Sequence, residues 1–542
     1  GDASVYGTLR RLFAAGALTS YVVPSDEGPH RKYYGLNDRG RERLKEMTER
    51  VFHHKMTTFE DLWEGESAKT PRAFNNRDSS KPQVIEYACE DAFWCLAHHL
   101  KHYDMVKDSL IFQYEIDLIP VLCRMEREGL MLDWDAMAEK AEEAKTFALQ
   151  MNEDIQEELS DRLGRTLSLN LGSAPQLAKI LFDELGLPVI KRSEKTGAPS
   201  TDATSLAAIS KKDKTVKRIL QFREVAKLRN SYLDRYVGGL NYREDGRGVP
   251  NHNQLGAITG RFSVDGVSYQ QWPKPYFYEL SDGTTFSFNF RDTLLSPEGF
   301  RIVGYDFSQV ELRMLAGIAG EEALIQSFLD GEDVHKRTAA LMLKKDIKDI
   351  TKKERAIGKT LNFAIVYGAG AARIANMLTT PEDPISVKQA QAMLDAYFKA
   401  LPKIAAWLEN TRAAAQFQTE DQSVMTPFGR KVKIWEYQSD SNGIKAQGDR
   451  LATNAPPQGG AADYMKIGMV RAQRAIDEAG LADKIRMIMT VHDALEFYVH
   501  ESVPTQQVID LISPAVTFGE ETFPEILAGY PPIKADWHEG YT

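Results

Sequence analysis

Two apolar runs that each lead into an aspartate constrain the fold of this chain more than any other feature of its sequence. The run FRIVGY leads into Asp306, at the start of DFSQVELRML, and the run IRMIMTV leads into His492 and Asp493, which a second apolar run, ALEFYV, follows. A polar pair between two β-rich runs is typical of the tip of a hairpin. Either aspartate alone is also compatible with a helix N-cap or a surface turn. The sequence therefore predicts a strand that ends at Asp306 and a hairpin with Asp493 at its tip.

Carboxylates on two separate strands suit a magnesium site. Mg²⁺ is a hard, octahedral ion that one or two protein carboxylates and substrate phosphates usually hold together, and Asp306 and Asp493 are the candidate ligands. The three cysteines, Cys89, Cys95 and Cys123, form no CxxC pair, which argues against a disulfide framework and against a structural zinc site.

Between the two aspartates lies a helical stripe with the residue types that a nucleoside triphosphate requires. In TKKERAIGKTLNFAIVYGAG, the residues Arg355, Lys359, Phe363 and Tyr367 recur at steps of four and so share one helix face. Guanidinium and ammonium groups bind phosphates, and ring faces stack on a base or a sugar. The glycines of the following YGAG predict the end of the helix.

The length and composition of the chain predict an ordinary globular protein of several domains. A chain of 542 residues is too long for one compact core, and 43% hydrophobic and 27% charged residues are usual values. The absence of an apolar stretch near 20 residues and of a signal-peptide pattern predicts a cytoplasmic protein without a membrane partner. The net charge is −10, although LKKDIKDITKKERAIGK (343–359) gathers basic residues; such a run is either a solvated helix face or an anion-binding surface.

The spaced motifs of residues 112–542 resemble those of the family A DNA polymerases, the class of bacterial polymerase I and its phage relatives. DFSQVELR, RAIGKTLNFAIVYG and TVHDALEF resemble the family's A, B and C motifs, and TGRFS, FGRKV and DRLATNAPPQGGAAD are similar to further motifs in family order. SLNLGSAPQLAKILFDELGLP and REVAKLRNSY resemble its thumb. The resemblance implies an α+β right-hand fold with an antiparallel palm sheet and helical fingers and thumb.

The same resemblance implies a template-dependent DNA polymerase that adds deoxyribonucleotides to a primer 3′ end in replication or repair. Two Mg²⁺ ions, which Mn²⁺ can replace, are expected on Asp306, Asp493 and the carbonyl of Phe307, with Lys359 as a further catalytic residue. Glu311 is expected to exclude the 2′-hydroxyl. The implied nucleotide-binding residues are Gln309, Glu311, His335, Arg355, Lys359, Phe363 and Tyr367. The implied DNA contacts are Lys227, Arg261, Arg430, Arg450, Asn454, Gln458 and His492. Primer–template DNA and dNTPs are the expected partners of a monomer, and an accessory replication factor stays unidentified.

The chain departs from the family pattern at three positions. Ala494 stands where the family has a third acid, and Glu496 is expected to replace it because alternate strand residues share a face. A lower rate or an altered metal preference is expected. Ala364 replaces a glycine, and Gly358, inside the nucleotide-binding helix, predicts a looser helix because glycine costs about 1 kcal/mol there relative to alanine.

The first hundred residues carry two other resemblances. Residues 1–50, with VYGTLRRLFAAGAL, two strand-like runs around DEGP and the helical DRGRERLKEM, resemble part of a PadR-type winged helix. This part is either a packing element or an independent DNA reader. In YACEDA, Tyr87 and Asp91 are similar to the last motif of a 3′–5′ exonuclease, but the other acids of that site do not appear upstream. The expectation is a polymerase without proofreading.

The predicted organisation has six parts: a winged-helix-like segment (1–50), an exonuclease remnant (51–110), the thumb and the start of the palm (111–250), the palm with Asp306 (251–320), the fingers (321–425), and the palm with Asp493 (426–542). Two alternative functions remain open from the sequence. One is a single-subunit RNA polymerase, and the other is a non-catalytic DNA-binding protein on a polymerase scaffold.

Overall fold

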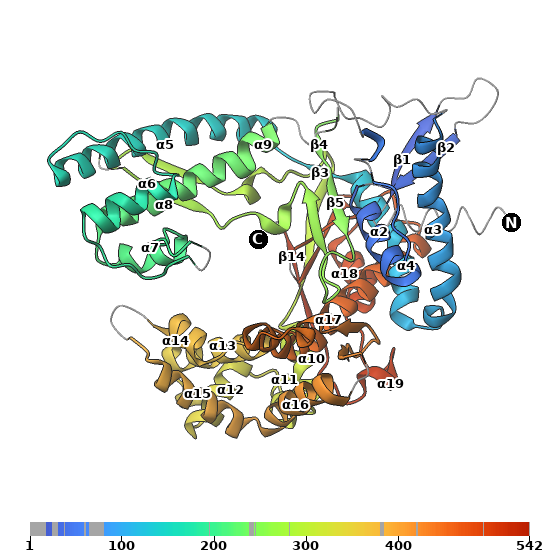
Figure 1. Cartoon of the computed structure of the whole chain (residues 1–542). Coiled ribbons are helices and arrows are strands. Elements are labelled where there is room, and N and C mark those ends of the chain that lie inside the picture. Colours follow the sequence, from blue (N-terminus) through green and yellow to red (C-terminus); the bar gives the residue numbers. More distant parts are fainter. Residues whose placement is uncertain are drawn as a thin grey trace.

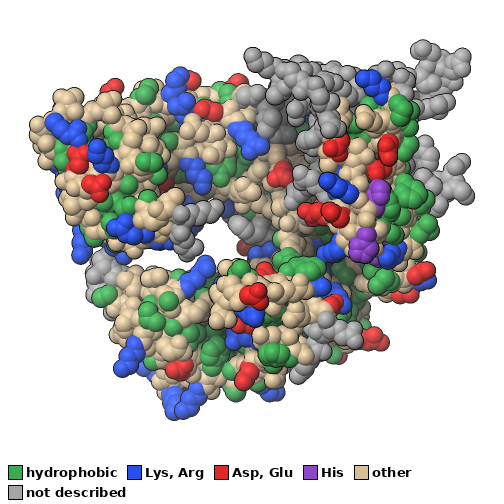
Figure 2. All heavy atoms as spheres, viewed as in Figure 1, with side chains coloured by type: hydrophobic (Ala, Val, Ile, Leu, Met, Phe, Trp, Pro, Cys, Tyr) green, Lys and Arg blue, Asp and Glu red, His purple; other side chains and the backbone are tan. Residues whose placement is uncertain are grey.

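The computed structural model describes residues 18–23, 31–36, 38–58, 61–63, 81–193, 196–237, 243, 245–280, 282–379, 384–418, 421–491 and 493–540. Figure 1 shows a central sheet with one helical lobe on its upper left, a second below it and the N-terminal elements on its right. Figure 2 shows an opening between the two helical lobes. None of the helices in the described part of the chain has the length and apolarity needed to cross a membrane.

The central sheet has four antiparallel strands in the order β12-β13-β9-β14. They are β9 (Phe300–Phe307), β12 (Ile485–Val491), β13 (Ala494–His500) and β14 (Ala535–Glu539). β12 and β13 form the predicted hairpin, with Val491 opposite Ala494, and β9 pairs with β13 so that Asp306 faces Ala494. The predicted strand and hairpin are therefore confirmed, and they are neighbours in one sheet, which we call the palm.

Alternation along the strands separates a core face of the palm from a polar face. Val303, Tyr305 and Phe307 on β9 pack into one hydrophobic cluster with alternate residues of β13 and with residues of several helices. These helices include α4 (Leu110–Glu128), α17 (Asn442–Glu478) and α18 (Thr505–Val516). Because successive side chains point to opposite faces, Asp306 and Glu496 share the other face.

The upper lobe, which we call the thumb, consists mainly of long amphipathic helices, as the sequence predicts. The long helices are α5 (Trp134–Leu163) and α8 (Lys214–Leu228), and the shorter α7 (Ala203–Ser210) lies in the same lobe. The Asp133 side chain caps α5 by accepting from the Ala136 amide, and Gly164 ends the helix with a φ of 63°, a conformation that glycine adopts without a Cβ clash. The apolar faces of these helices pack with the hairpin of β7 (Tyr276–Glu279) and β8 (Thr285–Phe288).

The lower lobe, the fingers, is helical and has its own core, formed by residues between 312 and 408. Its helices are α11 (Glu322–Leu329), α12 (Val334–Leu343), α13 (Lys352–Val366), α14 (Ala371–Leu378), α15 (Val387–Ala400) and α16 (Pro402–Ala413). α10 (Val310–Ala319) joins this lobe to the palm, because its residues contribute to both cores. A capping box fixes the start of α13, since Thr351 and Glu354 each accept from the backbone of the other.

The N-terminal elements match the predicted hairpin followed by a helix. β1 (Leu18–Val23) and β2 (Arg31–Leu36) are antiparallel, and α2 (Asp38–Phe52) contacts α3 (Pro82–Val106). Thr48 Oγ1 lies 3.2 Å from His98 Nε2, and the Phe52 and Trp94 rings are 5.1 Å apart. The helical pattern expected before β1 lies outside the described residues. The end of α2 therefore packs against α3.

Candidate nucleotide-binding and metal-binding site

Asp306 and Asp493 come together where β9 and the β12–β13 hairpin meet. The Phe307 amide donates to the Asp493 carbonyl at 2.8 Å, and Asp306 faces Ala494, the residue after Asp493. Burial raises the pKa of Asp493 to about 6, and the charges of Glu311 and Asp306 add to the shift while Arg261 opposes it. The two carboxylates predicted from the sequence are thus close enough to influence each other's charge.

This donor set fits a hard divalent cation that also binds substrate. Among the described residues, no three His, Cys, Asp or Glu side chains form a metal cluster by themselves. Asp306, Asp493 and the Phe307 carbonyl offer only oxygen, and two carboxylates with room for phosphate are the usual protein share of a Mg²⁺ site. Repulsion from Glu311 and Asp306 adds to the effect of burial in raising the pKa of Asp493, and a bound cation relieves such repulsion.

Glu496 lies on the face predicted for it. It is opposite Gly304, two residues along β13 from Ala494, and His538 Nε2 lies 3.3 Å from its carboxylate. Gly304 leaves this space free, because a Cβ there would come within 2.4 Å of Glu496 Oε2. Burial and the charge of Asp306 raise the pKa of Glu496 to about 8. The group is therefore mainly protonated at neutral pH in the absence of a cation.

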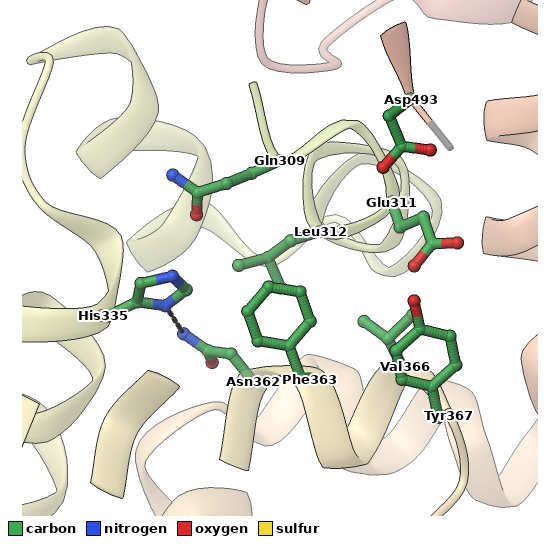
Figure 3. A pocket seen from close by; sticks show the side chains of 9 residues that line it. All are labelled: Gln309, Glu311, Leu312, His335, Asn362, Phe363, Val366, Tyr367 and Asp493. Carbon is green, nitrogen blue, oxygen red and sulfur yellow. Dashed lines mark hydrogen bonds between the residues drawn. The ribbon is translucent and has the colours of Figure 1, made fainter. Parts of the chain in front are cut away.

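A pocket beside these aspartates collects side chains from α10, α12 and α13 (Figure 3). In Figure 3 the Phe363 ring lies between His335 and Tyr367, and Glu311 and Asp493 close one end. The pocket is lined by five of the predicted nucleotide-binding residues: Gln309, Glu311, His335, Phe363 and Tyr367. Leu312, Asn362 and Val366 complete its lining.

His335 is held as a neutral hydrogen-bond donor. Burial lowers its pKa to about 4, and its Nδ1 lies 3.1 Å from Asn362 Nδ2, which can only donate. This contact leaves the proton on Nε2. Asn362 is itself buried and also donates to Thr338 Oγ1 at 3.0 Å. Sequence reasoning missed Asn362, although a polar amide within the apolar run LNFAIV was a usable signal.

The two cations of the α13 stripe differ in their surroundings. Arg355 Nε lies 2.5 Å from Asp333 Oδ2, and the other oxygen of Asp333 caps α12 by accepting from the amides of residues 335 and 336. Lys359 is exposed, with its Nζ 5.8 Å from the centre of the Phe363 ring. Asp333 was also missed from the sequence.

Glu311 closes the pocket through two contacts. It forms an ion pair with Arg261, whose Nη2 also lies 3.9 Å from Asp493 Oδ1. The Tyr367 hydroxyl points toward Glu311 in Figure 3, and burial together with this carboxylate raises the pKa of Tyr367 to about 12. Gln309, at the start of α10, has a φ of 55°. This left-handed conformation is strained for a residue with a side chain.

The predicted DNA contacts are scattered over several surfaces. Lys227 is exposed on α8, and Arg450 is exposed at a second pocket that Asn454 and Tyr367 also line. Gln458 is largely buried within α17. His492 lies outside the described residues.

Arg430 is a correction to the sequence interpretation. Its Nε donates to Asp463 at 2.7 Å, and its Nη2 pairs with Glu115. Lys466, completely buried, reaches the same Glu115 carboxylate at 2.6 Å. The Arg430 side chain is 13% exposed, and it balances buried acids inside the palm.

Gly358 is a second correction, because the helix that it was expected to loosen packs closely against its neighbour. A Cβ at this position would lie 2.4 Å from the His335 carbonyl oxygen and 3.3 Å from the Ala339 Cβ. The missing side chain lets α13 approach α12 closely. Ala364 is buried in α13, and the structure gives no sign of a disturbed helix there.

Comparisons with known proteins agree with this geometry. The family model described as DNA polymerase family A matches residues 137–517, and the transcriptional regulator PadR-like family matches residues 1–46. DNA polymerase I of Pseudomonas aeruginosa is 31% identical over 100% of this chain and 55% of its own length. A thermostable DNA polymerase I of Thermus thermophilus is 35% identical over 72% of this chain and 44% of its own length. The chain thus spans about half the length of the curated relatives that it matches.

A solved structure supports the fold. The POL domain of Pol1 from M. smegmatis, in complex with DNA primer-template and dNTP, has a TM-score of 0.72 and 23% identity, covering 98% of this chain and 81% of its own. The family model covers most of the chain, and its three main motifs meet around one pocket. This chain therefore belongs to DNA polymerase family A.

Proposed function

We propose that this chain is a template-dependent DNA polymerase that adds deoxyribonucleotides to a primer 3′ end during DNA replication or repair. The observation that carries the proposal is the meeting of Asp306 and Asp493 beside a pocket formed by the α12–α13 helix pair. The similarity to DNA polymerase I from two organisms supports it.

In this proposal, the incoming dNTP lies along α13 with its phosphates near Lys359, Arg355 and His335. The ammonium and guanidinium groups bind phosphate oxygens, and the neutral His335 donates a hydrogen bond from Nε2 without adding charge. Phe363, 39% exposed, packs against the sugar. Catalysis then depends mainly on holding the α-phosphate in line with the primer hydroxyl.

Asp306, Asp493 and the Phe307 carbonyl would hold the divalent cations, with Mg²⁺ as the expected ion and Mn²⁺ as a substitute. When bound, these ions lower the pKa of the primer hydroxyl and neutralise the triphosphate. Glu496 would replace the third acid at a reduced efficiency, since it must lose a proton that its buried site retains.

Glu311 would select deoxyribonucleotides by leaving no space for a 2′-hydroxyl. Its carboxylate is 6% exposed and is fixed by Arg261, so an added hydroxyl would meet a filled and charged wall. Lys227, Arg450 and Asn454 would contact the primer–template, through phosphates and minor-groove acceptors, without regard to sequence.

The remaining assignments follow the same division of the chain. Residues 51–110 would be an exonuclease remnant without proofreading, since only Tyr87 and Asp91 in YACEDA are similar to an exonuclease motif. Residues 111–250 would be the thumb and the start of the palm, 251–320 and 426–542 the palm, and 321–425 the fingers. The polymerase would act as a monomer.

The test is extension of a labelled primer on a defined template with four dNTPs and Mg²⁺. The native chain should extend the primer, and Asp306→Asn and Asp493→Asn should each lower the rate by at least about a thousandfold, a loss typical of removing charge stabilisation at the reacting groups. Asp440→Asn, a change at an exposed carboxylate, is the matched control and should extend normally. Extension by all three variants alike would refute the proposed metal site.

A further inference from the structure

The hairpin that carries Asp493 lies at an edge of the palm sheet, and its backbone is closed by side chains from another segment. β12 is the outermost strand beside β13, so in the described part of the chain no strand pairs with its outward amide and carbonyl groups. An edge group buried without a partner costs as much as a lost hydrogen bond. Thr490, three residues before Asp493, is such a position and is fully buried.

Two consecutive side chains form hydrogen bonds with the backbone amide and carbonyl of Thr490. Its amide donates to the Tyr269 hydroxyl at 3.0 Å, and Gln270 Nε2 donates to its carbonyl at 3.0 Å and lies 3.3 Å from its hydroxyl. Both residues belong to the short helical turn Tyr269–Gln271. The end of β12 is therefore attached to this turn as a strand is attached to its neighbour.

The Tyr269 hydroxyl is held in place by a second layer. His252 Nε2 lies 2.8 Å from it, and both side chains are buried. Glu126 on α4 accepts from the His252 amide at 2.7 Å and lies 3.5 Å from its Nδ1. The Tyr269 hydroxyl shares a hydrogen bond with His252 Nε2 and also accepts from the Thr490 amide. These two contacts hold the Tyr269 oxygen in place.

Asp493 is thus fixed from two sides. On one side the Phe307 amide donates to the Asp493 carbonyl, which sets its distance from Asp306. On the other side, Tyr269 and Gln270 fix the strand that leads into the turn. A displacement of about 1 Å at a reacting group can cost a hundredfold in rate, so the second attachment affects chemistry and not only stability.

We propose that Tyr269, oriented by His252, is a positioning residue that sets the place of the Asp493 carboxylate in the metal site. The proposal rests on the function proposed above, because it concerns the same carboxylate. Tyr269 touches neither substrate nor metal in this role and acts through the backbone of β12.

The test compares Tyr269→Phe with Tyr498→Phe. Tyr498 lies on β13 of the same sheet, is fully buried, and its hydroxyl likewise binds backbone, the Met131 amide at 3.0 Å and the Leu295 carbonyl at 3.0 Å. Both variants lose one buried hydroxyl and should lose similar thermal stability. Tyr269→Phe alone should lower kcat by about tenfold or more, with the Kd for primer–template unchanged.

A second measurement avoids turnover. With a dideoxy-terminated primer, dNTP binding can be titrated against Mg²⁺, and Tyr269→Phe should require several times more Mg²⁺ for half-maximal binding than the native chain or Tyr498→Phe. His252→Gln should shift the same midpoint in the same direction if Tyr269→Phe folds poorly. Equal kcat and equal Mg²⁺ midpoints in the two tyrosine variants would overturn the inference. A native chain that fails to extend a primer would instead overturn the proposed function.

Discussion

The close approach of α12 and α13 predicts that Gly358→Ala lowers the stability of the protein, although alanine has a higher helix propensity than glycine. By helix propensity alone, Gly358→Ala would stabilise the helix by about 1 kcal/mol. The added Cβ, however, would lie 2.4 Å from the backbone oxygen of His335, which cannot rotate away as a side chain could. Overpacking of this kind costs about 1–3 kcal/mol. With backbone on both sides, we expect the upper part of that range and a net loss of about 1–2 kcal/mol in unfolding free energy.

The same substitution should affect nucleotide binding. If α12 moves away to make room, His335 shifts relative to the α13 stripe, so the KM for dNTP should rise several-fold while the Kd for primer–template stays unchanged. Thermal unfolding and single-nucleotide extension kinetics measure the two effects. Gly443→Ala is the control, because its nearest neighbour beyond the local backbone is Ser441 Oγ at 3.7 Å, and it should be neutral or stabilising. A Gly358→Ala variant with native stability and native KM would refute the reasoning.

Three further outcomes are expected. Glu311→Ala should open space beside the sugar and raise incorporation of ribonucleotides by at least about tenfold relative to dNTPs, as measured in single-nucleotide extension; unchanged discrimination would contradict the role of Glu311. Phe363→Tyr should increase incorporation of dideoxynucleotides, which chain-termination assays detect, because the added hydroxyl can replace the contact that the missing 3′-hydroxyl makes; Phe277→Tyr, at another exposed ring, should not. The neutral His335 should make the protein less stable as the pH falls. Its pKa is lowered from 6.5 to about 4, so between these pH values the unfolded chain binds a proton that the folded chain does not. At pH 5 the unfolding free energy should be lower by about 2 kcal/mol. Urea unfolding at pH 7 and pH 5 should show this loss in the native chain and a smaller one in His335→Gln.

The sequence predicted the features that rest on local pattern. The hairpin at residues 492 and 493 followed from two β-rich runs, and the α13 stripe followed from steps of four. Both patterns are set by periodicity within one element. The contact between Asp306 and Asp493 needed more, namely the motif order of the family, because no local rule says which strand pairs with β9.

The features that the sequence did not predict depend on partners from distant segments. Arg430 was assigned to DNA from the family resemblance of FGRKV, whereas its partners Glu115 and Asp463 lie on α4 and α17. Gly358 looked like a weak point because the helix that approaches it cannot be identified from α13 alone. Asn362 and Asp333 were missed for the same reason, since each acts on a neighbouring helix.

The buried charges of the palm impose an order on folding during synthesis. Glu115 is made early, but Arg430 follows 315 positions later and Lys466 follows 351 positions later. A buried carboxylate without its cations costs several kcal/mol, so α4 cannot take its final place until α17 has left the ribosome. The fingers core uses only residues between 312 and 408 and can form before then. Nascent chains should therefore acquire a protease-resistant fingers lobe first, and the palm should close last.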